Sequence, residues 1–256
     1  MMRDLHVTLI ELDELWSYVG KKQKRVTDED NSEVGDQYVF VALGTLNKAI
    51  ISYRVGKRDM PNTEAFARDL RSRVLGTPQV SSDAFPAYEG AIASAFDNLD
   101  YGQIVKSYKG EPPVNAARRY SPGWVVGVKK EVIFGQPTKR LICTSHIERE
   151  NLNVRMSSRR FTWLSNGFSK KLANHEAAVA LYVASHNLCR VHGTTRETPA
   201  TSLGLTDHLW SIAELLDAAL SAGGEDDEPT APPPMPVMLP PVARRPQFTV
   251  IQGGRA

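Results

Sequence analysis

Three acidic residues stand in sequence surroundings that suit metal-assisted phosphate chemistry. Asp13 lies in the run IELDELW, Asp83 ends the run VSSD, and Glu148 lies in the run HIERENLN. Carboxylate oxygens are ligands that Mg²⁺ prefers. Two such cations about 3.5–4 Å apart activate an attacking oxygen and stabilise a leaving oxygen in phosphoryl transfer. If the three side chains converge, they would support cutting or joining of a phosphodiester backbone.

Each acid also has an ordinary structural explanation. An aspartate at a strand end, such as Asp83, is often a turn former, and Pro86 nearby favours a turn. Glu148 is one of two glutamates in its run, and composition alone does not separate it from Glu150. Asp13 is harder to explain as a turn or surface residue, because its acidic neighbours put at least one carboxylate on a strand face that should be apolar.

The elements that must position these acids follow from hydrophobic periodicity and turn signals. Asp13 falls in an expected strand over 7–19, and the apolar runs 37–43 and 49–55 flank a short turn, which predicts a hairpin. Spacing of four between apolar residues predicts a helix over 63–75. A strand over 78–82, a helix over 88–96, a short strand over 104–106 and possible strand character over 124–134 follow.

This order of elements is typical of a ribonuclease H-like fold. The fold class is α/β, and we expect a mixed five-stranded sheet flanked by helices. In such a fold the first and fourth strands lie side by side. The fold therefore predicts that Asp13 and Asp83 are neighbours although they are far apart in the sequence.

The second half of the chain is predicted to be mostly helical. A helix begins near His146, the pattern breaks near Asn166, and a long helix covers about 174–191. A short helix begins at Thr198, and Ser211 with Glu214 forms a capping box. We divide the chain into a catalytic domain over 1–192, a helical extension over 193–221, and an acidic, proline-rich tail over 222–256 that we expect to be disordered.

Positive charge is concentrated in the middle of the chain. Between Gln103 and Asn174 there are fourteen Lys and Arg residues against four Glu. Such a block is typical of a surface that binds a polyanion, although a solvated basic helix is the alternative. Helical spacing after Glu148 puts guanidinium groups on the face that bears the acid. The candidate DNA-binding residues are Arg149, Asn151, Arg155, Arg159, Arg160, Lys170 and Lys171.

Composition excludes several classes of protein. With 256 residues and 41% hydrophobic content, the chain can bury a core. Cys143 and Cys189 are too few and too far apart for a zinc finger or a disulfide framework. No apolar run reaches the length needed to cross a bilayer, so we expect a cytoplasmic protein with no membrane partner.

Four motifs, in this order and spacing, resemble those of DDE transposases of the insertion sequence 1 family. They are DELWSYVGKK at 13–22, SDAFPAY at 82–88, IERENLNVR at 147–155 and GFSKK at 167–171. The resemblance implies that Asp13, Asp83 and Glu148 are the catalytic, metal-binding triad, and it prefers Glu148 to Glu150. It further implies two Mg²⁺ or Mn²⁺ ions, and cleavage and strand transfer at the ends of an insertion sequence.

The same resemblance carries expectations about partners. It implies DNA, both element ends and target, as substrate, a homo-oligomer on that DNA, and a nucleoid-associated protein in a bacterial cytoplasm. Enzymes of that family carry a zinc-binding segment and a helix-turn-helix ahead of the first aspartate, whereas this sequence has twelve residues ahead of Asp13. We expect either a separate DNA-binding product of an upstream reading frame or a truncated copy.

Two alternatives stay open. The chain is a catalytically incomplete relic that binds DNA and regulates a full-length transposase, or it is another ribonuclease H-like nuclease, such as a junction resolvase.

Overall fold

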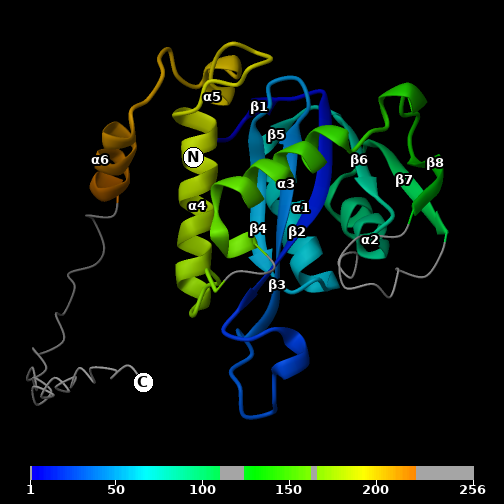
Figure 1. Ribbon diagram of the computed structural model, residues 1–256. Helices are drawn as coiled ribbons and strands as arrows, with labels where there is room; N and C mark the ends of the chain where they lie inside the picture. Colours follow the sequence, from blue (N-terminus) through cyan, green and yellow to red (C-terminus); the bar gives the residue numbers. More distant parts are fainter. Residues whose placement is uncertain (1, 110–123, 163–165, 223–256) are drawn as a thin grey trace, which may run out of the picture.

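The computed structural model describes residues 2–109, 124–162 and 166–222 (Figure 1). Of the tail expected over 222–256, residues 223–256 lie outside the described ranges. The strands are β1 (Leu5–His6), β2 (Leu9–Val19), β3 (Gly35–Gly44), β4 (Ile50–Gly56), β5 (Val74–Leu75), β6 (Gln79–Asp83), β7 (Asp100–Lys109) and β8 (Trp124–Phe134). The helices are α1 (Met60–Arg73), α2 (Pro86–Ala95), α3 (Ser145–Ser157), α4 (Leu172–Leu188), α5 (Pro199–Ser202) and α6 (Ile212–Ala222).

A mixed sheet forms the centre of the molecule. Its strand order is β4-β3-β2-β6-β7-β8. The pairs β2–β3 and β3–β4 are antiparallel, whereas β6 is parallel to both β2 and β7. The first five strands of this sheet along the chain are β2, β3, β4, β6 and β7. They have the arrangement expected from the sequence, because the first of them, β2, lies next to the fourth, β6. The architecture is α/β and is compatible with a ribonuclease H-like fold.

The sheet has six strands, so the expectation of five was wrong by one. β8 pairs antiparallel with β7 at the edge of the sheet. Val125 and Val126 are consecutive in β8, and more than half of each side chain is exposed. Because both faces of this strand meet solvent there, its sequence lacks the alternation of buried and exposed residues that marks a strand.

Alternating residues of the central strands build a separate core on each face of the sheet. On β3, Phe40 and Ala42 pack with the cluster formed by α1 and α2, whereas Val39 and Val41 pack with residues of α3 and α4. This is the period of two expected for a strand covered on both faces. Helices therefore cover both faces, as Figure 1 shows.

The C-terminal helices largely begin where the sequence predicts. Thr198 caps α5 through its hydroxyl, which accepts from the Thr201 backbone N–H. At α6 the capping box is formed: the Glu214 N–H donates to Ser211 Oγ at 3.1 Å, and the Ser211 N–H donates to the Glu214 carboxylate at 2.6 Å. Both cysteines are free thiols and partly buried. None of the described helices combines the length and apolarity that a bilayer crossing requires.

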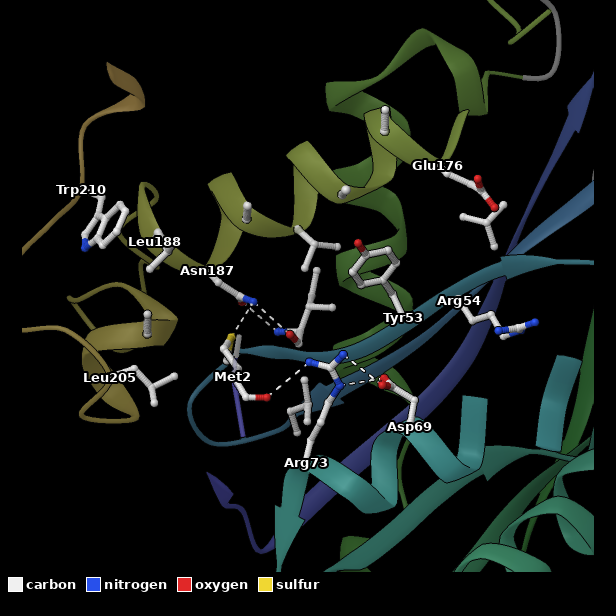
Figure 2. Close-up of a pocket in the computed structure, with 18 of the residues that line it drawn as sticks. Met2, Tyr53, Arg54, Asp69, Arg73, Glu176, Asn187, Leu188, Leu205 and Trp210 are labelled. Carbon is white, nitrogen blue, oxygen red and sulfur yellow. Dashed lines mark hydrogen bonds and ion pairs between the residues drawn. The ribbon is translucent and has the colours of Figure 1, made fainter. Parts of the chain in front are cut away.

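A mostly apolar cavity of about 890 Å³ lies among β4, α1 and α4, beside Trp210 (Figure 2). At its floor Arg73 pairs with Asp69 and donates to the Met2 carbonyl, while the Asn187 amide bonds to Ile50. These contacts tie the N-terminal segment to α1 and α4. None of the three predicted catalytic acids lines this cavity, so we assign it no part in the chemistry.

Candidate active site

The pairing of β2 with β6 brings Asp13 and Asp83 together. The parallel register runs from Leu9 opposite Gln79 to Leu12 opposite Ser82. Asp13 and Asp83 are the next residue on each strand, so they stand level where the pairing ends. The adjacency expected from the strand order is therefore present.

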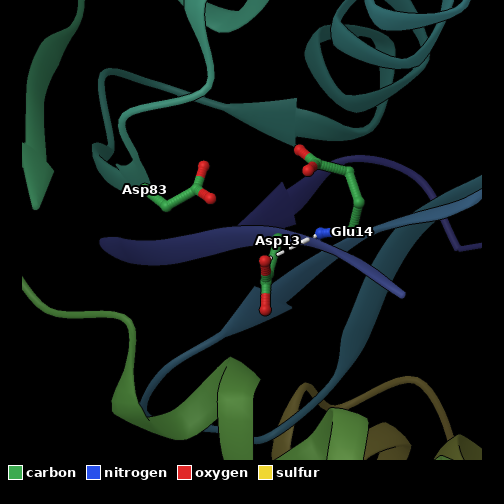
Figure 3. Close-up of side chains that lie close together, drawn as sticks. All are labelled: Asp13, Glu14 and Asp83. Atoms are coloured by element: carbon green, nitrogen blue, oxygen red, sulfur yellow. Dashed lines mark hydrogen bonds between the residues drawn. The ribbon is translucent and has the colours of Figure 1, made fainter. Parts of the chain in front are cut away.

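Asp13, Asp83 and Glu14 form one acidic cluster (Figure 3). Each residue offers a carboxylate oxygen, and these three oxygens all lie within 4.8 Å of one another. An all-oxygen donor set of this kind suits Mg²⁺ or Mn²⁺. Sequence reasoning missed Glu14, because consecutive strand residues point to opposite faces of a sheet. It contributes here because β6 ends beside it, at Asp83.

Burial raises the pKa values of two residues of this cluster, Asp13 and Glu14. Burial first, and then the charge of Asp83, raises the pKa of Asp13 to about 6, although hydrogen bonds from the Glu14 N–H and Asn151 oppose the shift. Burial likewise raises the pKa of Glu14 to about 7, with the Asp83 charge adding to it. Carboxylates so close together repel when ionised, and a divalent cation would relieve that repulsion.

The surroundings of Glu14 support a cation rather than a finished ion pair. Its side chain is only 3% exposed, and one oxygen accepts from Arg58 at 3.0 Å. The other oxygen, Oε1, is buried and accepts no hydrogen bond of good geometry from the described residues, although the buried Tyr88 hydroxyl lies near enough to lower the pKa of Glu14. An unpaired buried carboxylate oxygen costs free energy unless a ligand satisfies it, so the residues present fit a bound metal ion.

Glu148 lies beside the acidic cluster and outside the group of oxygens that defines it. It is in the first turn of α3, and its carboxylate accepts from Lys106 of β7 and from Thr144. Its charge nevertheless raises the pKa of Asp13. Asn151, one turn further along α3, donates to Asp13 Oδ2 at 2.8 Å. This hydrogen bond therefore holds the face of α3 that bears Glu148 against Asp13.

Lys106 is a site residue that sequence reasoning missed. Its ammonium group neutralises Glu148, and hydrogen bonding and charge from that glutamate raise the pKa of Lys106 against the effect of burial. The charge of Asp13 acts in the same direction. A lysine in a basic block carries no local signal that would have identified it, because the contact with Glu148 is purely tertiary.

Glu150, the other glutamate of the motif, is committed elsewhere. It is 4% exposed, and its carboxylate accepts from Tyr182 and Asn153 and lies 3.1 Å from His186. Tyr182 and His186 belong to α4. Glu150 thus joins α3 to α4 and points away from the acids, which favours Glu148 as the candidate ligand.

A further buried acid, Glu11, fixes the start of α3. It is 2% exposed, and one oxygen accepts from the backbone N–H groups of His146 and Ile147, each at 2.9 Å. Those N–H groups lack partners within the helix, and the positive end of the helix dipole favours an anion there. Glu11 on β2 therefore sets where Glu148 stands relative to Asp13.

The predicted DNA-binding residues do not form one helical stripe. α3 ends at Ser157, because Ser158 adopts an extended conformation, so Arg159 and Arg160 lie in a separate 3₁₀ turn. Asn151 is buried and bonded to Asp13, which makes it a positioning residue rather than a surface contact.

Three of the remaining basic residues, Arg160, Lys170 and Lys171, lie in the 3₁₀ turn and in the segment just before α4. Arg160 donates to Ser169 Oγ at 2.7 Å. Lys170 Nζ lies 3.4 Å from the centroid of the Phe168 ring, which is a cation–π contact. Backbone pairing of Val19 with Ser169 ties this loop to the end of β2. The exposed residues of the set are Arg149, Arg155, Arg159, Lys170 and Lys171.

Comparison with known proteins gives little. No family model matches the chain, and no curated protein matches it. Among solved structures, one that matches is a piggyBac transposase in a synaptic complex with hairpin DNA, at 14% sequence identity and a TM-score of 0.35. The match covers 83% of this chain and 57% of that transposase chain.

Proposed function

We propose that this chain is the catalytic portion of a metal-dependent DNA transposase, similar to the DDE transposases of the insertion sequence 1 family. The single observation that carries the proposal is the cluster of Asp13 and Asp83 on adjacent parallel strands, with α3 held against it. The motifs that bear these residues resemble those of that family in order and spacing.

In this proposal the acids hold two Mg²⁺ or Mn²⁺ ions. Bound there, the ions would activate a water or a DNA 3′-hydroxyl and stabilise the leaving oxygen of the phosphoryl transfer. Asp13 and Asp83 would be shared ligands, Glu148 would hold one ion, and Glu14 is an added candidate from the geometry. Asn151 keeps the Asp13 carboxylate oriented.

Lys106 has a place in the same scheme. Without a bound cation its ammonium group neutralises Glu148. If Glu148 were to turn toward a bound ion, Lys106 would lose this partner and could pair with a phosphate oxygen of the DNA.

Site-directed variants test the proposal. Asp13→Asn and Asp83→Asn should each abolish Mg²⁺-dependent cleavage of element-end DNA and leave DNA affinity intact or raised, since they remove a ligand and a negative charge. Asp97→Asn is the matched control, because Asp97 is an exposed aspartate in the turn after α2. Cleavage by Asp13→Asn at the control rate would refute the assignment.

The products of the reaction separate the alternatives. Cleavage followed by joining of a 3′-hydroxyl to target DNA supports a transposase. Structure-selective cutting without joining favours a junction-resolving nuclease. DNA binding without any metal-dependent cleavage favours a regulatory relic.

A further inference from the structure

The helix that carries Glu148 has a second functional face. A turn of about 100° per residue places Glu148, Asn151 and Arg155 on one side of α3, and His146, Arg149 and Asn153 on the opposite side. The first side leans on Asp13. The second side lines a separate cavity of about 400 Å³, closed by the turn between β3 and β4 and by residues that follow α4.

The lining of this cavity is rich in cationic groups from segments far apart in the sequence. Lys48 comes from the β3–β4 turn, Arg149 from α3, and Arg190 from the segment after α4, while three histidines add ring nitrogens. One carboxylate, Glu150, lines it as well. That carboxylate is occupied by Tyr182, Asn153 and His186.

Lys48 is held inside the cavity rather than extended into solvent. It is 9% exposed, and its ammonium group donates to the Thr45 carbonyl at 2.6 Å and to His146 Nδ1 at 3.0 Å. An ammonium group has three N–H donors. Two are used by these contacts, which leaves one for a ligand.

The positive charges of these groups repel one another in the absence of an anion. Burial, followed by the charges of Lys48 and His186, lowers the pKa of His192. Burial lowers the pKa of Lys48, and the charge of Glu11 opposes this effect. An anion that entered the cavity would relieve this crowding and would accept hydrogen bonds from several directions.

We propose that this cavity binds a phosphate group of the DNA backbone, through Lys48, Arg149 and Arg190, on the side of α3 opposite the acids. The inference rests on the proposed function in taking DNA as the ligand. The two phosphate positions are separated by the diameter of α3, about 10 Å. One helix would thus align a strand at both, so that binding at the cavity sets which phosphodiester meets the acids.

The salt dependence of DNA binding tests the proposal. In the full chain carrying Asp13→Asn, with chelator present, affinity for a duplex oligonucleotide is measured by fluorescence anisotropy over a range of salt. The double substitution Lys48→Gln with Arg190→Gln should reduce the magnitude of the log–log slope of affinity against salt by about 0.9, the loss of one phosphate contact, and each single substitution should reduce it by part of that amount. Arg68→Gln is the matched control, because Arg68 is an exposed arginine on α1, paired with Glu64.

Arg190 is exposed, so its substitution keeps the test valid if Lys48→Gln disturbs the fold. Equal slopes for Arg190→Gln and Arg68→Gln would overturn the inference. A second measurement follows the imidazole resonances of His146 and His192 during titration with DNA and, separately, with inorganic phosphate. Shifts with DNA support the site, whereas shifts with inorganic phosphate alone overturn the backbone assignment.

These outcomes are independent of the catalytic proposal. A selective loss of slope in a chain that shows no Mg²⁺-dependent cleavage would sustain the phosphate site and refute the transposase. Cleavage by the unsubstituted chain, together with equal slopes, would sustain the transposase and refute the phosphate site.

Discussion

Asp13, Glu14 and Asp83 crowd three carboxylates into one small volume, and burial raises the pKa values of Asp13 and Glu14. Motif reasoning predicts two of these three residues. Glu14 escaped it because strand alternation places neighbours on opposite faces, and only the end of β6 lets both reach the same space. Lys106 and Glu11 escaped it as well, because their roles depend on contacts with α3 that no local pattern encodes.

The raised pKa values of Asp13 and Glu14 predict how the stability of the metal-free chain varies with pH. A raised pKa in the folded state contributes stability that is fully present below the unfolded pKa and is lost as pH rises through the folded pKa. For Asp13 and Glu14 that loss falls between about pH 4 and 7. The Asp13 shift corresponds to at most about 3 kcal/mol. Because burial lowers the pKa of His175 to about 4, which makes stability rise over the same pH range, the loss should appear in urea unfolding with chelator as a decrease in stability relative to Asp13→Asn.

Substitution gives this prediction its control. Asp13→Asn should be more stable than the unsubstituted metal-free chain at pH 7 and should lose this advantage toward pH 4. Asp97→Asn, at an exposed position, should change stability by less than about 0.5 kcal/mol. A difference between Asp13→Asn and the unsubstituted chain that does not grow from pH 4 to 7 would show that burial does not raise the pKa of Asp13 as described.

Lys106 predicts competition between an internal cation and the metal. Because its ammonium group must leave Glu148 before that carboxylate can bind an ion, Lys106→Gln should tighten Mn²⁺ binding. A partly exposed pair of this kind contributes up to about 1 kcal/mol, which corresponds to roughly fivefold in affinity. Titration calorimetry would measure it. Unchanged or weaker Mn²⁺ binding would mean that Glu148 is not a ligand.

At the scale of elements, α3 decides whether the acids form a working site. The sequence predicts the start of this helix near His146, and the structure starts it at Ser145. It does not predict the end, because the basic pattern continues through Arg159 while two consecutive serines, Ser157 and Ser158, close the helix. Serine side chains compete for backbone hydrogen bonds, which makes a helix end there understandable after the fact.

Glu11 is the contact by which the sheet holds α3, and its removal should loosen that helix. Glu11→Leu leaves two buried backbone N–H groups without an acceptor, at a cost of about 2–3 kcal/mol. Glu11→Gln keeps an acceptor oxygen and should cost less. Hydrogen exchange of the α3 amides and urea unfolding would measure both. Equal protection of α3 in Glu11→Leu and the unsubstituted chain would contradict this role.

At the scale of the whole molecule, strand order was the most predictable feature. The succession of three antiparallel strands, helix, strand, helix and strand leads to adjacent first and fourth strands, and β2 and β6 are adjacent. The possible strand over 124–134 is present as β8. Its place as a sixth strand of the sheet and both cavities were not predicted, because they depend on which surfaces remain uncovered once the helices pack. The assembly on DNA stays a prediction from the resemblance.

Anomalous diffraction from crystals grown with Mn²⁺ tests the central claim most directly, since it locates the ions. We expect a peak between the carboxylates of Asp13 and Asp83, with Glu148 turned from Lys106 toward the metal. Crystals of Asp13→Asn should lose this peak. Saturating Mn²⁺ that leaves these carboxylates without a bound ion would contradict the account.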